Sequence, residues 1–220
     1  MRIFKTTFIF GFCWALVLGG SACLADDAKP LYENDFEKAE MGKVPEDMMV
    51  LDGGFEVKQE NGNKFLELPG APLDTYNILF GPTVKSEVSV SARIRGTSHG
   101  RREPTFAVGL NGQGGYRLQV SASKNELEIF KGDESVAHVA FQWKSGTWTM
   151  LKLQVAKSGN IWKIEGKAWA QGSEEPKKPM ISYDETKEPN PGRASIWGSP
   201  FSNTPIQYDD FVVKSVAPAN

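Results

Sequence analysis

The chain has 220 residues, of which 40% are hydrophobic and 24% are charged. This length suits one domain, and the apolar content is enough to bury a core, which excludes a mainly disordered chain. The formal net charge is −2, so the basic excess on which most nucleic-acid binders depend is missing. Only the N-terminal stretch is apolar enough to enter a bilayer, which excludes a polytopic membrane protein.

Residues 1–25 have the pattern of a secretory signal peptide. A basic start precedes an apolar run at 8–18, and small residues then lead to Ala25. The run is short for a bilayer span, so we expect cleavage after Ala25. The alternative is lipoprotein processing with a lipid anchor at Cys23, although Gly20 stands where that signal normally has a bulky aliphatic residue.

Both cysteines, Cys13 and Cys23, lie in this segment. The mature chain is therefore predicted to have neither a disulfide nor a thiolate metal site, although it is exported. This cysteine usage is typical of a bacterial protein of the periplasm or the extracellular space. We expect one domain over residues 26–216, a short tail at 217–220, and no membrane span in the mature chain.

Apolar and polar residues alternate through the mature chain, which is the period of a strand with one wet face. The alternation is found at residues 88–95, 105–111, 116–121, 126–130, 151–155 and 162–169. Turn residues that tolerate positive φ separate these runs, and no long helical period appears. The spacing predicts antiparallel sheets packed as an all-β sandwich, with loops at the proline-rich segments 176–179 and 189–191.

The order of several short motifs along the chain carries a resemblance. The motifs are Glu-Asn-Asp-Phe-Glu at 33–37, Gly-Gly-Phe-Glu-Val at 53–57, Gly-Tyr-Arg-Leu-Gln-Val-Ser at 115–121, and the segments 125–129, 146–153, 191–197 and 207–213. This order resembles the concanavalin A-like (laminin-G-like) lectin and glucanase superfamily, near the exported bacterial 3-keto-disaccharide hydrolase-like domains. The resemblance covers nearly all of the mature chain and implies a two-sheet antiparallel jelly roll.

Glycoside hydrolysis is the first activity that the resemblance implies. The glucanase members carry carboxylates at alternate positions of one strand, and the nearest match here is Glu126 and Glu128. Phe130 follows them and the third carboxylate is absent, which favours two solvated carboxylates on a strand face. A hydrolase or lyase acting on glycosides or 3-keto-glycosides, with Glu126, Glu128 or His99 as acid or base, stays open as an alternative.

Sugar binding needs flat aromatic faces and planar hydrogen-bonding side chains on the polar side of a sheet. Trp169 stands among charged neighbours, where either a ligand or the segment 176–179 is expected to cover it. We expect the carbohydrate-binding residues of the concave sheet to be Arg93, Arg117, Gln119, Glu126, Glu128 and Trp169. Four other tryptophans are expected to be core or strand-end anchors: Trp143, Trp148, Trp162 and Trp197.

The resemblance also implies a structural calcium ion where the first and last strands meet, with Asp35 and Asp209 as its ligands. No other cofactor is expected. The leading hypothesis is an exported, non-catalytic module that binds a polysaccharide, a glycan or another envelope polymer on its concave sheet. A structural envelope protein, with a partner covering the sheet face, is the third possibility.

Overall fold

The computed structural model describes residues 29–71 and 74–218. Within these ranges the chain forms 15 strands and one short 3-10 turn, η1 (Ala122–Lys124), which confirms the prediction of an all-β chain. The predicted signal peptide lies outside the described residues. No helix in the described ranges is long and apolar enough to cross a membrane.

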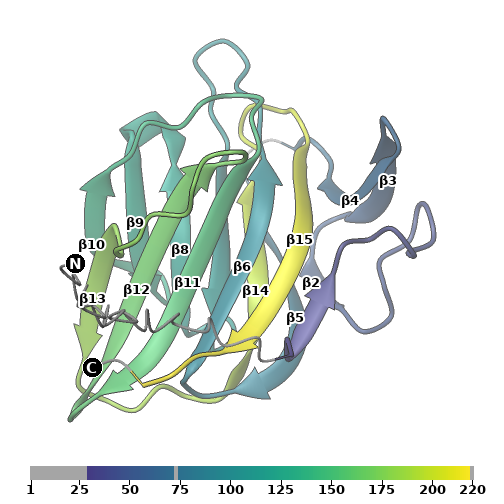
Figure 1. Ribbon diagram of the computed structural model, residues 1–220. Coiled ribbons are helices and arrows are strands. Elements are labelled where there is room, and N and C mark those ends of the chain that lie inside the picture. The colour runs from purple at the N-terminus through teal and green to yellow at the C-terminus, as the bar shows by residue number, and fades with distance from the viewer. Residues whose placement is uncertain (1–28, 72–73, 219–220) are drawn as a thin grey trace, which may run out of the picture.

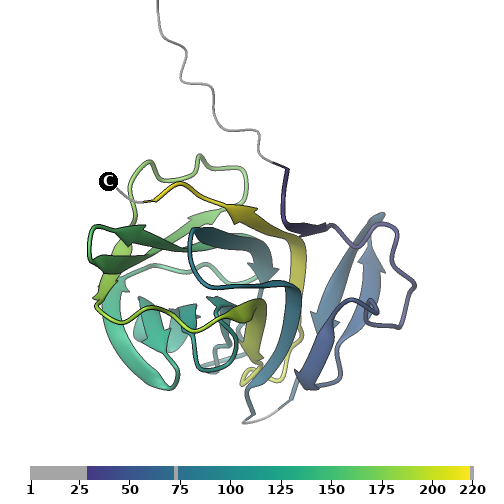
Figure 2. The same cartoon turned by 90° about the horizontal axis from the view of Figure 1, so that it is seen from below.

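Two antiparallel sheets are packed face to face (Figure 1), and the view from below shows them as two layers (Figure 2). Sheet A has eight strands, in the order β13 (Ile181–Glu185), β12 (Ile161–Ala170), β11 (Thr149–Ser158), β6 (Val88–Arg95), β15 (Ile206–Ser215), β4 (Asn63–Leu68) and β3 (Glu56–Glu60), with β1 (Tyr32–Asn34) also paired to β15. Sheet B has seven strands, in the order β10 (Glu134–Ala140), β9 (Glu126–Lys131), β8 (Tyr116–Ser121), β7 (Thr105–Leu110), β14 (Gly192–Ser199), β5 (Tyr76–Val84) and β2 (Met49–Asp52).

Strand residues alternate between the core and the outer face, as the sequence predicts. In β8, Leu118 and Val120 are fully buried between the sheets, whereas Arg117 and Gln119 lie on the outer face. The two proline-rich segments are loops, which is also as predicted. The alternation tells which face a residue takes but not which sheet its strand joins. Strands β6, β11 and β12 belong to sheet A, whereas β7, β8 and β9 belong to sheet B.

The core is built from apolar side chains of both sheets. Phe80 of β5 and Phe211 of β15 stack across the interface with ring centroids 4.6 Å apart. Gly166 of β12 lies where the sheets approach closely, because a Cβ there would come within 2.4 Å of Leu118 Cδ1. Burial of this apolar surface, at about 25 cal/mol per Å², is the main stabilising term.

Strand β15 carries an irregularity that shapes the outer face of sheet A. One edge of β15 pairs with β6, and the other edge is shared between β4 and β1. The register with β6 shifts between Asp209 and Val212, and Asp210 adopts a left-handed φ of 51°. This bulge leaves Asp209 opposite Arg93 of β6, on the outer side of the sheet.

Candidate functional site

A guanidinium group lies between two aromatic rings on the outer face of sheet B. The Cζ atom of Arg117 is 4.6 Å from the centroid of the Phe130 ring and 4.6 Å from that of Trp197. Phe130 belongs to β9 and Trp197 to β14, on opposite sides of β8, so the rings approach Arg117 from opposite sides. Each contact of this kind contributes about 0.5–2 kcal/mol, and together they hold the guanidinium in one place.

Small residues form the surface beneath this stack. Gly109 of β7 lies opposite both Arg117 and Ser195 in the strand register. A Cβ at position 109 would come within 2.4 Å of Ser195 Oγ, so only glycine fits there. Ser195 Oγ accepts a 2.9 Å hydrogen bond from Trp197 Nε1, which fixes the orientation of the indole. The sequence of β7 and β14 therefore makes room for the stack and sets its geometry.

Two buried polar atoms on this face, Arg117 Nε and Asn77 Oδ1, have no hydrogen-bond partner among the described residues. Asn77 of β5 lies opposite Trp197 in the register, so the two unpaired atoms lie on either side of that residue. An unpaired buried polar atom costs about 1–3 kcal/mol. Native structures keep few of them, and each one calls for an explanation such as a ligand or an ordered water.

Glu128 of β9 is 2% exposed, and its oxygens are already occupied. It accepts hydrogen bonds from Ser121 Oγ, from Ser135 Oγ at 2.9 Å and from Lys124 Nζ at 3.1 Å. Burial alone raises the pKa of Glu128, but these three donors outweigh burial and lower the pKa below its ordinary value. Glu128 is therefore a carboxylate held in its charged form, whereas a general acid needs a raised pKa.

The structure brings four of the six predicted binding residues together on sheet B. Gln119 lies opposite Glu128 and donates a 2.9 Å hydrogen bond to Ser121 Oγ, and Glu126 lies opposite Ser121 at the start of β9. With Arg117, these residues share the outer side of β8 and β9. We call the surface formed by the following residues the Arg117 face: Asn77, Gly109, Arg117, Gln119, Glu128, Phe130, Ser195 and Trp197.

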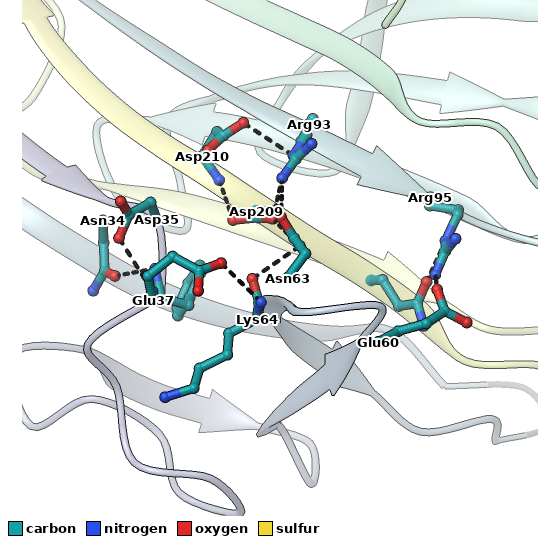
Figure 3. A network of polar contacts seen from close by, with 12 residues as sticks. Asn34, Asp35, Glu37, Glu60, Asn63, Lys64, Arg93, Arg95, Asp209 and Asp210 are labelled. Carbon is teal, nitrogen blue, oxygen red and sulfur yellow. Dashed lines mark hydrogen bonds and ion pairs between the residues drawn. The ribbon is translucent and has the colours of Figure 1, made fainter.

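Arg93, the fifth predicted residue, lies on the outer face of sheet A, where other residues occupy its donors (Figure 3). Its Nη2 donates to Asp209 Oδ2 at 2.5 Å and to Asn63 Oδ1 at 2.8 Å. Its Nε lies 2.9 Å from Asp210 Oδ2, which is within ion-pair distance although the N–H is not directed at that oxygen. We call Asn63, Arg93, Asp209 and Asp210 the Arg93 cluster, and it links β4, β6 and β15.

Tryptophan stacking also occurs on this second face. The Cζ atoms of Arg93 and Arg95 lie 4.9 Å and 5.0 Å from the centroid of Trp148, which precedes β11. Arg95 also donates to Gln207 and pairs with Glu60. Apart from the Arg93 Nε–H, the charged groups of this face are therefore engaged with one another.

Trp169, the sixth predicted residue, also lies on the outer face of sheet A, half-buried beside a hollow of about 220 Å³. Glu175 borders the same hollow and accepts hydrogen bonds from Lys152 at 3.0 Å and from Lys167 at 2.7 Å. The segment that leads into 176–179 is thus tied down next to Trp169. Because Trp169 and Arg117 lie on different sheets, the thickness of the sandwich separates them.

No protein-family model matches this chain, and no curated protein matches it in sequence. Solved structures do match. One is the carbohydrate-binding module CBM66 from Bacillus subtilis, at 13% identity and a TM-score of 0.52, covering 77% of this chain and 96% of that one. The chain has the concanavalin A-like jelly-roll fold.

Two other structures with this jelly-roll fold show how widely it is used. The metal-free carbohydrate recognition domain of Emp46p has 11% identity and a TM-score of 0.57, and covers 85% of this chain and 97% of that one. A glycosyl hydrolase family protein from Mycobacterium fortuitum has 10% identity and a TM-score of 0.53, and covers 84% and 99%. Carbohydrate-binding proteins thus use this fold, and identities this low establish the fold alone.

The calcium ion expected at Asp35 and Asp209 does not fit the residues present. Asp209 Oδ2 accepts hydrogen bonds from Asn63 Nδ2 at 2.8 Å and from the Arg93 guanidinium, and Oδ1 accepts the next backbone amide at 2.7 Å. A cation at Asp209 would meet a guanidinium that is itself largely buried. In the described part of the chain, no group of three or more His, Cys, Asp or Glu residues is arranged to hold a metal.

The expectation that Trp197 is a core or strand-end anchor is wrong. Trp197 lies on the outer face, because it has the same strand parity as Ser195 and stacks on Arg117, whereas Ala194 and Ile196 pack in the core between the sheets. The strand parity of Trp197, which can be read from the sequence, was the signal that indicated the outer face. Phe130 gave the same signal by sharing its parity with Glu128. Asn77 was missed because no strand was predicted in its part of the sequence.

Proposed function

We propose that the protein is an exported, non-catalytic module that binds carbohydrate, either a polysaccharide or a glycan, on the Arg117 face. The observation that carries this proposal is the stacked guanidinium of Arg117, whose buried Nε has no partner in the described chain. Export is supported by the signal-peptide pattern of residues 1–25.

Carbohydrate matches the chemistry of this face. A sugar hydroxyl both donates and accepts hydrogen bonds, so a single class of ligand suits both the guanidinium of Arg117 and the side-chain amide of Asn77 on this face. The apolar C–H side of a pyranose ring packs on flat aromatic surface, which Trp197 and Phe130 supply. Because Ser195 and the guanidinium fix the indole, little conformational freedom is lost on binding.

The non-catalytic part of the proposal is supported by Glu128, the better-placed of the two strand carboxylates. Its three hydrogen-bond donors hold it in the charged form and occupy its oxygens. A glycosidase of this kind needs one carboxyl group that gives up a proton and a second that attacks or activates water. Glu128 in this environment is suited to neither role, and it stabilises the turn between β8 and β9 instead.

Binding to a panel of polysaccharides and glycans, followed by titration calorimetry on the tightest member, tests the proposal. We expect Trp197→Ala to weaken binding at least tenfold, because it removes the aromatic surface and one side of the guanidinium stack. Trp169→Ala is the matched control, since it removes the same side chain from sheet A, and we expect its affinity to equal that of the wild type.

Two binding results would contradict the proposal. Thermal unfolding first establishes that both variants are folded. If the folded wild-type protein binds no member of the panel, or if Trp169→Ala abolishes binding while Trp197→Ala does not, the Arg117 face is not the binding surface.

A further inference from the structure

We infer that the Arg117 face recognises the carboxylate of an acidic sugar, so that the ligand is a polysaccharide containing uronic acid rather than a neutral one. This inference rests on the proposed function and names the class of its ligand. It follows from three features of Arg117: the missing counter-ion, the covered ring-facing sides of the guanidinium, and the engagement of the neighbouring carboxylate.

Arg117 differs from the other arginines in the strands because, among the described residues, its guanidinium forms no ion pair and no hydrogen bond with a protein group. Arg93 and Arg95 pair with carboxylates, and Arg193 donates to two backbone carbonyl oxygens at 2.8 Å and 2.6 Å. No carboxylate among the described residues lies within ion-pair distance of Arg117, and its buried Nε has no partner there. A partly desolvated positive charge without an anion is costly, and a bound anion removes that cost.

Two carboxylates, Asp133 and Glu128, act on the charge of Arg117 from beyond ion-pair distance. Asp133 is exposed, so solvent screens its charge, and Glu128 is engaged by other residues. Glu128 lies on the same face as Arg117, two residue pairs further along the β8–β9 ladder. Its oxygens accept hydrogen bonds from Ser121, Ser135 and Lys124, so the charge of Glu128 is balanced by Lys124. Arg117 therefore remains available to an anion from outside the protein.

The stacking selects the shape of that anion. Phe130 and Trp197 come from strands on opposite sides of β8, and each ring centroid is 4.6 Å from the Arg117 Cζ atom. With rings approaching from both sides, the edge of the guanidinium is the part left for a ligand. The N–H groups on that edge match the two oxygens of a planar carboxylate in a bidentate pair. In polysaccharides, a planar carboxylate is most commonly supplied by a uronic acid. Burial lowers the pKa of Arg117, but a guanidinium stays charged at neutral pH.

The test compares each acidic polymer with its own methyl ester, which keeps the backbone and removes the charge. Polygalacturonate, alginate and hyaluronan are titrated beside their esters, together with neutral laminarin, xylan, mannan and dextran. We expect at least one acidic polymer to bind, and its ester to bind at least tenfold more weakly. Arg117→Gln keeps a planar polar side chain without charge, and we expect it to bind acid and ester alike.

A matched control separates this local effect from general attraction by positive charge. Lys163→Gln removes one positive charge from the outer face of sheet A, where Lys163 lies 3.5 Å from Asp184. We expect this variant to retain the full preference for the acidic polymer. If Lys163→Gln loses the preference as fully as Arg117→Gln does, the recognition is not local to Arg117 and the inference falls.

The two possible failures are distinguishable. If a neutral polymer binds while the acidic ones do not, or if an ester binds as tightly as its acid, the inference is overturned and the proposed function stands. If the folded protein binds no member of the panel, both the proposed function and the inference are overturned.

Discussion

Arg93 and Arg117 are each stacked on a tryptophan on an outer sheet face, but only one of them has its charge balanced. Arg93 meets two carboxylates and an amide oxygen, whereas Arg117 meets two aromatic rings and forms no ion pair or hydrogen bond with a protein group among the described residues. Cation–π stacking by itself therefore does not identify a binding site. The useful distinction is whether the donors of the guanidinium are already used by the protein.

The largest expected effect is on stability and comes from Arg93. Replacing Arg93 with Met leaves the fully buried Asp209 without its main counter-ion, and we expect the free energy of unfolding to fall by about 3 kcal/mol or more. Arg117→Met is the matched variant. Arg117→Met loses the stacking energy but also removes an unpaired buried N–H, and the two effects oppose each other. We therefore expect the free energy of unfolding to change by less than about 1 kcal/mol.

Urea denaturation of the wild type and both variants measures this difference. If Arg117→Met costs as much stability as Arg93→Met, Arg117 is a structural residue and the contrast between the two faces is lost.

A second prediction concerns Glu185 of β13, another carboxylate that the protein has fully engaged. It is 4% exposed and accepts hydrogen bonds from Lys131, from the Tyr116 hydroxyl at 3.1 Å and from the Lys187 amide at 3.0 Å. Burial acts to raise its pKa, but these donors prevail and lower the pKa to about 2. A pKa depressed in the folded state stabilises the protein above pH 4.5, and this stabilisation is lost as the pH falls towards 2.

Glu185→Gln should therefore lower the free energy of unfolding at pH 7 by about 1–2 kcal/mol. This is less than the full value of about 1.4 kcal/mol per pH unit of the depressed pKa, because the Lys131 side chain is exposed and solvent screens its charge. Denaturation curves of wild type and variant between pH 7 and pH 3 check this. The gap between them should narrow steadily below pH 5, and a gap that stays constant would show that the engaged carboxylate is not the source of the stability.

Much of the fold, and part of the candidate site, could be predicted from the sequence. Two-residue alternation placed Arg117, Gln119 and Glu128 on an outer face, because strand parity is a local property. It could not say that Arg93 and Trp169 lie on the other sheet, since sheet membership depends on pairing between distant strands.

The partners of these residues were equally hidden in the sequence. Asn63 and Asp209, which hydrogen-bond to Arg93, lie 30 and 116 residues away along the chain. Trp197 reaches Arg117 only because β14 is inserted between β5 and β7. A residue engaged by such contacts and one left without them look alike in the sequence, so only the structure separates the Arg93 cluster from the Arg117 face.

The most direct test of this account is nuclear magnetic resonance of the arginine Nε–H and tryptophan Nε1–H groups during titration with an oligosaccharide of the tightest-binding polymer. The account predicts that the Arg117 Nε–H and Trp197 Nε1–H signals shift and saturate with binding, while the Arg93 Nε–H signal stays in place. Saturation with the Arg117 signal unmoved, or with the shifts confined to Arg93 and Trp148, would contradict it.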